Sequence, residues 1–389
     1  MLRRLSPAPS SFARFNLSTA PSFPRLLFCA LAVFFLFTAA RPFAFAALVE
    51  GEIAGAKFAI ARPALWNRQL LLIAHGYRDE KAPLIADLFP DQLATKTLVD
   101  RGWMVAKTSY RRNGMVIADA IADLDALRAH IVHSYGTPTR VILEGESMGG
   151  LIVTLMAERE PGLYAGAIAI GAALSAKESD MTLGLSLQPQ IPLLFLTNQS
   201  ELEGPKNYVS AKLERPAANL RPALFRVSRS GHVNVNQRER LAAIEALIAW
   251  LDRDRDALPR PAQGGPYLDA TITPAPQPSR VARDPDARGF TARITEISAI
   301  YGNVFLDAQP ADFTAVGIGG KTFFQLTVHG ETHRVLYGRD FNDVKRGEWV
   351  AFPNADGYVW LSRNYENAAT SARLQLGDTL ILRRYPDPK

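Results

Sequence analysis

Two patterns of hydrophobic and polar positions divide the chain. Between residues 47 and 256, short and largely apolar runs alternate with stretches in which apolar residues recur every three or four positions. The short runs are typical of strands buried on both faces, and the longer spacing is typical of amphipathic helices. This alternation predicts an α/β domain with a doubly wound, mostly parallel sheet. The predicted strands cover residues 70–74, 104–108, 141–143, 165–170 and 192–196, and the predicted helices cover 116–131 and 241–251.

The pattern changes after residue 256. Seven prolines and a Gly264-Gly265 pair make residues 257–288 a predicted extended linker. From residue 289 to residue 389, short strand-like runs are separated by glycine, asparagine and aspartate turns. Such a series predicts a small β-rich, barrel-like domain. The strand-like runs are 292–300, 323–328, 334–337, 349–352, 358–361 and 379–383.

Residues 1–46 have the features of a secretory signal peptide. Five arginines and no acidic residue accompany a 15-residue apolar run over 26–40, and Ala44-Phe45-Ala46 would permit cleavage before Ala47. The run is shorter than the roughly 20 residues that a membrane span needs, and an uncleaved anchor is the alternative. We therefore expect a periplasmic or secreted protein of the bacterial envelope that is not membrane-bound after cleavage.

Charge and cysteine content exclude several classes of function. The formal net charge is +6, and the leader carries five of these charges, so only about +1 remains for the rest. A chain that is basic only in its leader is not expected to bind nucleic acid. The one cysteine, Cys29, lies in the leader. The mature chain is therefore expected to lack disulfides, thiolate catalysis and a zinc site with cysteine ligands, and no cofactor or metal is expected.

The sequence Gly145-x-Ser147-x-Gly149 is the strongest chemical signal in the chain. The apolar run 141–143 leads directly into it, and a helix-like run over 151–158 follows. A nucleophilic serine on a tight strand-to-helix turn needs glycines at the flanking positions, because the neighbouring backbone passes very close. Ser147 is the predicted nucleophile, and the alternative is a plain glycine-rich turn with an exposed serine.

A serine hydroxyl needs a base, and the base needs a group that orients it. Of the six histidines, only His232 follows Ser147 within the α/β region, in a loop before the last predicted helix. The orienting carboxylate is expected in the loop after the predicted strand 192–196. Glu201 is the preferred candidate and Glu203 the alternative; the carboxylate would hold the imidazole tautomer and stabilise the imidazolium.

Two backbone N–H groups are expected to bind the oxyanion. The N–H of Met148 lies at the start of the helix after the nucleophile, where the helix dipole favours negative charge. The second donor is expected in the loop after the predicted strand 70–74, and we assign it to the N–H of Tyr77. His75, at the end of that strand, is expected to be a structural polar residue.

Together these residues resemble the α/β-hydrolase superfamily. The matching pieces are His-Gly-Tyr at 75–77, Gly-Glu-Ser-Met-Gly-Gly at 145–150, the acid loop, and Gly-His at 231–232, in the order serine, acid, histidine. The resemblance covers residues 47–256 and extends to secreted esterase and peptidase-like members. It implies acyl-enzyme chemistry. The segment 172–190, where a cap domain often enters this fold, is short, so we expect substrate choice to rest on loops or on the second domain.

The last hundred residues are similar to the C-terminal domain of the S-adenosylmethionine hydroxide adenosyltransferase and halogenase family. Matching pieces include Tyr301-Gly302-Asn303, Asn354-x2-Gly357-Tyr358 and Asn367-Ala368-Ala369. The resemblance implies an adenine pocket with Tyr301, Asn303 and Ala368 as candidate contacts. The family's aspartate before the first motif is replaced around 298–300, and its catalytic N-terminal domain is absent. Packing against the hydrolase or against a second copy is therefore the expected role, with a retained adenine pocket as the alternative.

These features predict an exported serine hydrolase that acts on a small-molecule substrate, a carboxylic ester in the preferred interpretation. A serine peptidase of the same fold is the enzymatic alternative. A non-catalytic binding or adaptor protein that presents the C-terminal domain is the alternative from another class. Association of copies through the C-terminal domain is left open.

Overall fold

The computed structural model describes residues 47–175, 184–211, 221–252, 265 and 267–386. All of these residues belong to one compact unit. The predicted signal peptide, residues 1–46, lies outside the described residues. Within the described part of the chain, no helix is both long enough and apolar enough to cross a membrane.

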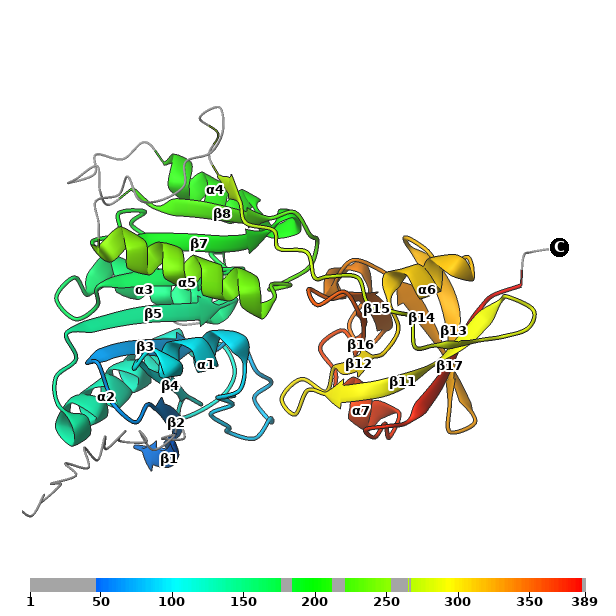
Figure 1. Cartoon of the computed structure of the whole chain (residues 1–389), viewed down its shortest axis with the longest axis horizontal. Helices are drawn as coiled ribbons and strands as arrows, with labels where there is room; N and C mark the ends of the chain where they lie inside the picture. The colour runs from blue at the N-terminus through cyan, green and yellow to red at the C-terminus, as the bar shows by residue number, and fades with distance from the viewer. Residues whose placement is uncertain (1–46, 176–183, 212–220, 253–264, 266, 387–389) are drawn as a thin grey trace, which may run out of the picture. The chain divides into compact units, whose positions relative to one another are not determined.

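The N-terminal half forms a nine-stranded sheet in the order β1-β2-β4-β3-β5-β6-β7-β8-β9 (Figure 1). Strands β3 to β9 are parallel, and the hairpin of β1 and β2 extends the sheet in antiparallel fashion beside β4. The predicted α/β-hydrolase sheet is therefore confirmed. The strands are β1 (Ala47–Ile53), β2 (Ala56–Arg62), β3 (Gln69–Ala74), β4 (Met104–Thr108), β5 (Arg140–Glu146), β6 (Gly166–Ile170), β7 (Leu193–Asn198), β8 (Ala223–Val227) and β9 (Leu268–Asp269).

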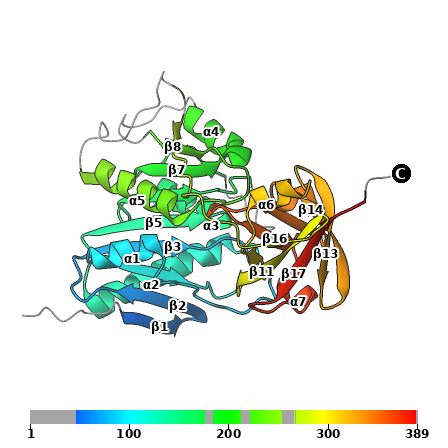
Figure 2. The same cartoon turned by 45° about the vertical axis from the view of Figure 1, so that its right-hand side comes forward.

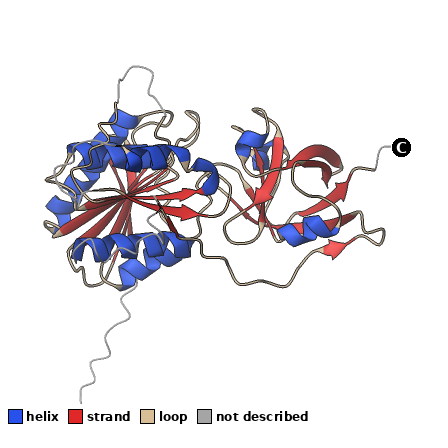
Figure 3. Cartoon of the chain, turned by 90° about the horizontal axis from the view of Figure 1, so that it is seen from above, coloured by secondary structure: helices blue, strands red, loops and turns tan. Residues whose placement is uncertain are grey.

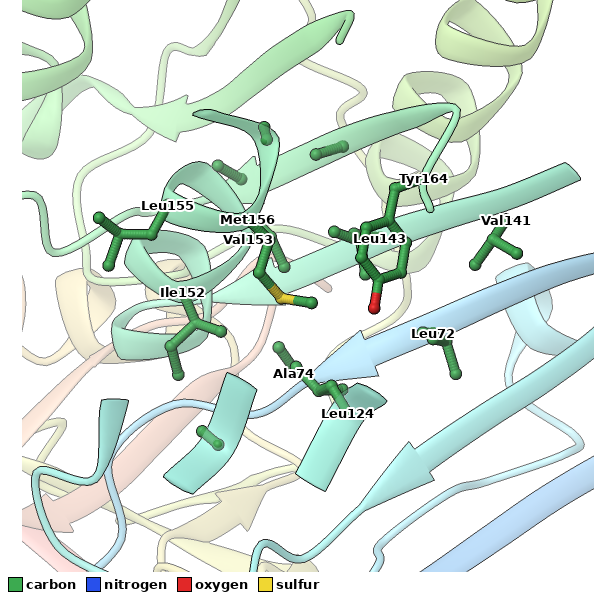
Figure 4. Close-up of a cluster of buried hydrophobic side chains, with 14 of the residues drawn as sticks. Leu72, Ala74, Leu124, Val141, Leu143, Ile152, Val153, Leu155, Met156 and Tyr164 are labelled. Atoms are coloured by element: carbon green, nitrogen blue, oxygen red, sulfur yellow. The ribbon is translucent and has the colours of Figure 1, made fainter. Parts of the chain in front are cut away.

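Helices cover both faces of this sheet (Figure 3). On one face, α2 (Ile117–Tyr135) and α3 (Met148–Arg159) pack on side chains of β3 and β5, and Figure 4 shows Leu72, Leu143 and Ile152 in this core. On the other face lie α1 (Leu93–Asp100) and α5 (Gln237–Asp252). Because both faces are buried, the central strands are mostly apolar, as their sequences indicate. The remaining helical segments are the 3₁₀ turn η1 (Gln199–Glu201) and α4 (Glu203–Ser210).

The C-terminal half closes into a seven-stranded barrel. Its strand order is β11-β12-β16-β15-β14-β13-β17, and β17 pairs again with β11, so the two lie side by side (Figure 2). Inward-facing aromatic rings such as Phe290, Phe313 and Phe324 fill the interior. The expected β-rich, barrel-like fold is confirmed. The strands are β11 (Gly289–Ile297), β12 (Val304–Leu306), β13 (Thr322–Val328), β14 (Glu331–Tyr337), β15 (Trp349–Pro353), β16 (Val359–Arg363) and β17 (Thr379–Arg384).

Short helical segments complete the barrel, and two short strands precede it. The segments are α6 (Pro310–Ala315), η5 (Phe341–Asp343) and α7 (Ala368–Ser371). Within the stretch predicted as a linker, β9 joins the hydrolase sheet beside β8, and β10 (Ala282–Arg283) pairs with β11. Two-residue strands carry too little periodicity to be recognised in a proline-rich sequence, because pairing rather than burial defines them.

Candidate active site

Ser147 occupies a strained turn between β5 and α3. Its φ of 55° and ψ of −115° lie outside the regions that a side chain normally adopts. The backbone holds it there, because its N–H donates to Ile170 O at 2.9 Å and its carbonyl accepts from Ala173 N at 3.0 Å. The half-buried side chain thereby lies at the carboxyl end of β5, the position required of a nucleophile in this fold.

Close backbone approach explains the two flanking glycines. A Cβ atom at Gly145 would lie 2.1 Å from the carbonyl oxygen of Gly149, and one at Gly149 would lie 2.1 Å from the carbonyl oxygen of Ala74. Neither contact can be relieved by a side-chain rotation, since both involve backbone. Gly76 is less tightly constrained, because its Cβ would lie 3.1 Å from that of Ser147. The end of β3 thus passes directly beside the nucleophile.

The structure brings Ser147, His232 and Glu201 into one hydrogen-bonded chain. His232 Nε2 lies 2.7 Å from Ser147 Oγ, and Nδ1 contacts Glu201 Oε1. His232 lies in the loop between β8 and α5, and Glu201 ends η1 after β7. The alternative carboxylate, Glu203, instead begins α4 and accepts from Asn207 Nδ2 at 3.3 Å at the surface. Glu201 is therefore the carboxylate that faces the imidazole.

The acid loop and the histidine loop are joined by their own hydrogen bonds. Asn198, at the end of β7, donates to Asn234 O at 2.9 Å and accepts from Asn234 N at 2.8 Å. The Ser200 hydroxyl donates to Gly231 O and accepts from Gly231 N, both at 2.9 Å. These bonds lie on either side of His232. They fix the imidazole relative to Glu201 through the backbone as well as through the side chains.

The imidazole of His232 is arranged to accept a proton. Burial opposes protonation, but the hydrogen bond and charge of Glu201, together with the charge of Asp340 in the barrel, raise the pKa of His232 above its ordinary value. A base whose protonated form is stabilised in this way can take the serine proton during attack and return it to a leaving group.

The assigned oxyanion donors belong to two segments that adjoin Ser147. Met148 is the first residue of α3, so its N–H lies at the positive end of the helix dipole. Tyr77 is half-buried and follows Gly76, the residue beside Ser147. His75, by contrast, is buried and stacks on Tyr110 with ring centroids 3.9 Å apart. Burial first, and then the charges of Arg78 and Lys107, lower the pKa of His75 to about 3, so it is neutral and structural.

Buried charges beneath the site were missed in the sequence. Lys107 Nζ pairs with Asp87 Oδ1 at 2.9 Å, and Arg78, next to Tyr77, contacts the same carboxylate. Glu144 is buried on β5 and pairs with Arg240 of α5. Lys107 and Glu144 interrupt otherwise apolar strand sequences, and this interruption is the signal that could have revealed them.

The three candidate adenine contacts of the barrel differ in their exposure to solvent. Tyr301 is exposed and Asn303 is half-buried. The motifs that contain them and Asn367 lie together, because Ala369 N donates to Gly302 O at 3.0 Å and a Cβ at Gly302 would overlap Asn367. Ala368 is fully buried in the barrel core. Its side chain is therefore not available to a ligand.

Two asparagines shortly after His232 contact the barrel. Asn234 Nδ2 donates to Pro353 O at 2.9 Å, and Asn236 Nδ2 donates to Ala355 O at 3.3 Å. Both acceptors lie at the turn between β15 and β16. The histidine loop is thus hydrogen-bonded to this turn as well as to the acid loop. Among the described residues, no cluster of three or more histidine, cysteine or acidic side chains could hold a metal ion.

Comparisons with known proteins identify two regions. Residues 67–215 match the family model described as serine aminopeptidase, S33, and residues 299–381 match the S-adenosylmethionine hydroxide adenosyltransferase C-terminal domain. No curated protein matches the chain.

Several solved structures are similar at low identity. A conserved protein of uncharacterized function from Thermotoga maritima is 15% identical with a TM-score of 0.26; the match covers 29% of this chain and only 41% of that one. Est1E from Butyrivibrio proteoclasticus is 12% identical with a TM-score of 0.39, over 53% of this chain and 98% of that one. FphF, a fluorophosphonate-binding serine hydrolase of Staphylococcus aureus, is 10% identical with a TM-score of 0.37, over 54% and 98%.

The sheet topology and the family matches agree with the resemblance drawn from the sequence motifs. The chain combines an α/β-hydrolase fold, matching the serine aminopeptidase S33 model, with a C-terminal barrel that matches the S-adenosylmethionine hydroxide adenosyltransferase C-terminal domain.

Proposed function

We propose that the protein is a serine hydrolase that cleaves carboxylic esters through an acyl-enzyme. The observation that carries this proposal is the hydrogen-bonded chain from Ser147 Oγ through His232 to Glu201 at a strained, glycine-flanked turn. Such a chain activates a hydroxyl that is otherwise a poor nucleophile.

In the proposed reaction, Ser147 Oγ attacks the ester carbonyl carbon while His232 Nε2 takes its proton. The N–H groups of Met148 and Tyr77 stabilise the resulting oxyanion. Collapse of this intermediate breaks the bond to the alcohol, which leaves with the proton from His232. Water, deprotonated by His232, then attacks the acyl-enzyme. The carbon–Oγ bond breaks, His232 returns the proton to Ser147 Oγ, and the acid is released. Glu201 keeps the imidazole oriented and does not itself take the proton.

Active-site labelling tests this proposal directly. A fluorophosphonate probe should label the wild-type protein covalently, and Ser147→Ala should abolish labelling. Absence of label on the wild type, or equal label on the variant, would contradict the proposal and favour the non-catalytic adaptor.

The bond that is cleaved is tested by substrate class. We expect hydrolysis of short p-nitrophenyl esters. The match of residues 67–215 to a model described as serine aminopeptidase favours the peptidase as the alternative. Turnover of aminoacyl anilides without turnover of the esters would identify the peptidase instead.

We infer from the leader sequence that the protein is exported and that the mature chain begins at Ala47. The inference rests on the arginines, the 15-residue apolar run and the Ala44-Phe45-Ala46 motif. N-terminal sequencing of the protein recovered from its native host should give Ala47 outside the cytoplasm. A chain that begins at Met1 and is recovered from the cytoplasm would contradict export.

For the barrel we propose a packing role rather than ligand binding. The contacts from Asn234 and Asn236, and the burial of Ala368, support this role. Titration calorimetry of the full chain with adenosine and with S-adenosylmethionine should detect no tight binding. Tight, selective binding of S-adenosylmethionine would make the barrel a ligand-binding module. If the barrel instead joins two copies, light scattering would show a dimer that a barrel surface variant dissociates.

A further inference from the structure

Arg240 makes a buried, two-pronged contact beneath the nucleophile. It lies in the first half of α5, and its guanidinium donates through Nη1 to Glu144 and through Nη2 to Glu146. Both carboxylates belong to β5, and Glu146 immediately precedes Ser147. The Arg240 side chain is 13% exposed and that of Glu144 is 1% exposed. The pair with Glu144 therefore lies almost entirely out of water, while Glu146 is 31% exposed.

The contact joins the two elements that carry the reacting groups. Strand β5 ends at the nucleophile, while α5 follows the loop that holds His232. Arg240 N donates to Asn236 O at 3.0 Å, so the guanidinium is attached through the helix backbone to the end of the histidine loop. A planar fork that contacts two carboxylates on one strand constrains both the separation and the rotation of strand and helix. Ser147 Oγ and His232 Nε2 move with these two elements.

Stability alone does not explain this arrangement. Moving the guanidinium and the Glu144 carboxylate out of water opposes folding, and apolar side chains of similar size often stabilise a core at least as well. Burial lowers the pKa of Arg240 to about 10, so the group still carries its charge near neutral pH. Helix α5 also packs on the sheet through buried hydrophobic residues such as Ile244 and Leu247, so it does not need the ion pairs to be held there.

We propose that Arg240 is a positioning residue, which sets the distance between Ser147 Oγ and His232 Nε2 by clamping β5 to α5. The proposal rests on the proposed hydrolase function. It assigns a role in the reaction to a side chain that does not touch the substrate, 93 residues beyond the nucleophile in the sequence. Glu144 and Glu146 are the partners through which it acts.

The test compares Arg240→Met and Arg240→Lys with a matched control, Arg238→Met. Arg238 is exposed on the same helix, so it reports the effect of removing a positive charge from α5. Displacing a catalytic group by about 1 Å can reduce turnover roughly 100-fold. Arg240→Met should therefore reduce kcat and the rate of fluorophosphonate labelling about 100-fold, with KM changed less than about 3-fold, since ester binding does not involve this side chain. Arg240→Lys should retain part of the activity that Arg240→Met loses, because an ammonium can contact one carboxylate but cannot contact both at once.

A second variant covers the case in which Arg240→Met does not fold. Glu146→Gln keeps the pair of Arg240 with the buried Glu144 and removes only the charge next to Ser147. It should reduce kcat by about 10-fold, which is less than the loss expected for Arg240→Met, because the contact between Arg240 and Glu144 remains. Circular dichroism and thermal melting of each variant identify those that fold.

A crystal structure of a folded variant gives a readout that does not depend on activity. The Ser147 Oγ to His232 Nε2 distance, 2.7 Å here, should lengthen beyond hydrogen-bonding range in Arg240→Met or Glu146→Gln. An unchanged distance, or a labelling rate within 2-fold of the wild type and of Arg238→Met, would overturn the positioning role. Failure of the wild type to be labelled would instead contradict the hydrolase proposal, and the distance comparison would still decide the role of Arg240.

Discussion

At the residue scale, the direction of individual side chains determines which carboxylate contacts His232. Glu201 and Glu203 are separated by one residue, yet only Glu201 faces His232, while Glu203 points to the surface and to Asn207. η1 ends at Glu201 and α4 begins at Glu203, so the two side chains leave the backbone in different directions. Substitutions at the two positions therefore compare the carboxylate that contacts His232 with one at the surface.

The first prediction uses this pair. Glu201→Gln should reduce kcat about 1,000- to 10,000-fold, because the imidazole loses its orienting charge while the rest of the site stays in place. Glu203→Gln is the matched control and should remain within about 2-fold of the wild type, since removal of an exposed charge has little effect. Ester hydrolysis by the purified variants measures both. Comparable losses in the two variants would contradict the assignment of Glu201.

The second prediction concerns pH. Since Glu201 and Asp340 raise the pKa of His232, and the neutral imidazole is the active base, kcat/KM should increase with pH through a midpoint above the ordinary histidine value of 6.5. In Glu201→Gln the midpoint should move to lower pH. The same interaction favours the protonated folded state. Its full contribution to the free energy of unfolding is present at pH values below the pKa of His232 in the unfolded chain. The contribution is lost as the pH rises through the pKa of His232 in the folded protein. A pH–rate profile with a wild-type midpoint below 6.5 would contradict this.

At the scale of elements, the turn between β5 and α3 depends on backbone packing against β3. Gly149 lies against the carbonyl of Ala74, and Gly145 lies against Gly149 itself. These contacts let α3 begin directly over the sheet, where its first N–H groups face the site. The nucleophile is therefore positioned by three elements rather than by its own loop.

The third prediction tests this packing. Gly149→Ala should lower the free energy of unfolding by more than about 3 kcal/mol, because its Cβ would overlap backbone that cannot rotate away. Gly162→Ala is the control, since a Cβ there would meet nothing within 4 Å, and it should change stability by less than about 1 kcal/mol. Urea unfolding followed by circular dichroism compares the two. Equal stabilities would contradict the close approach of α3 and β3.

At the scale of the whole molecule, hydrogen bonds connect the barrel to the loop that holds His232. The side-chain amides of Asn234 and Asn236 each donate to a carbonyl at the turn between β15 and β16. Asn236 also begins α5, where its Oδ1 accepts from the N–H groups of Arg238 and Glu239. One residue thus caps a helix of the hydrolase and contacts the barrel.

The fourth prediction separates these two roles with Asn236→Asp. A carboxylate can still cap α5, but it cannot donate to Ala355 O or Ile272 O, and it lies near the buried Glu239. We expect a loss of about 1–3 kcal/mol in the free energy of unfolding. A measurable fall in kcat should accompany it. Asn342→Asp, at an exposed position of the barrel, is the control and should leave both unchanged. A variant with wild-type kcat would show that the barrel contact does not influence His232.

The sequence by itself determined the features that depend on neighbours along the chain. The apolar strand before Gly145, the glycines around Ser147 and the order of serine, acid and histidine predict the nucleophile turn. Short strands between turns predict the barrel. Apart from the order of the three residues, each of these signals lies within a few residues, because strand burial and backbone crowding impose local patterns.

Only the tertiary structure decided the contacts between distant segments. It placed Glu201 rather than Glu203 against His232, paired Arg240 with Glu144 and Glu146, and brought Asn234 and Asn236 to the barrel turn. It also added β9, from the predicted linker, to the hydrolase sheet. These pairings join residues that no local pattern relates. They arise because buried charged and polar groups must find partners wherever the packed chain places them.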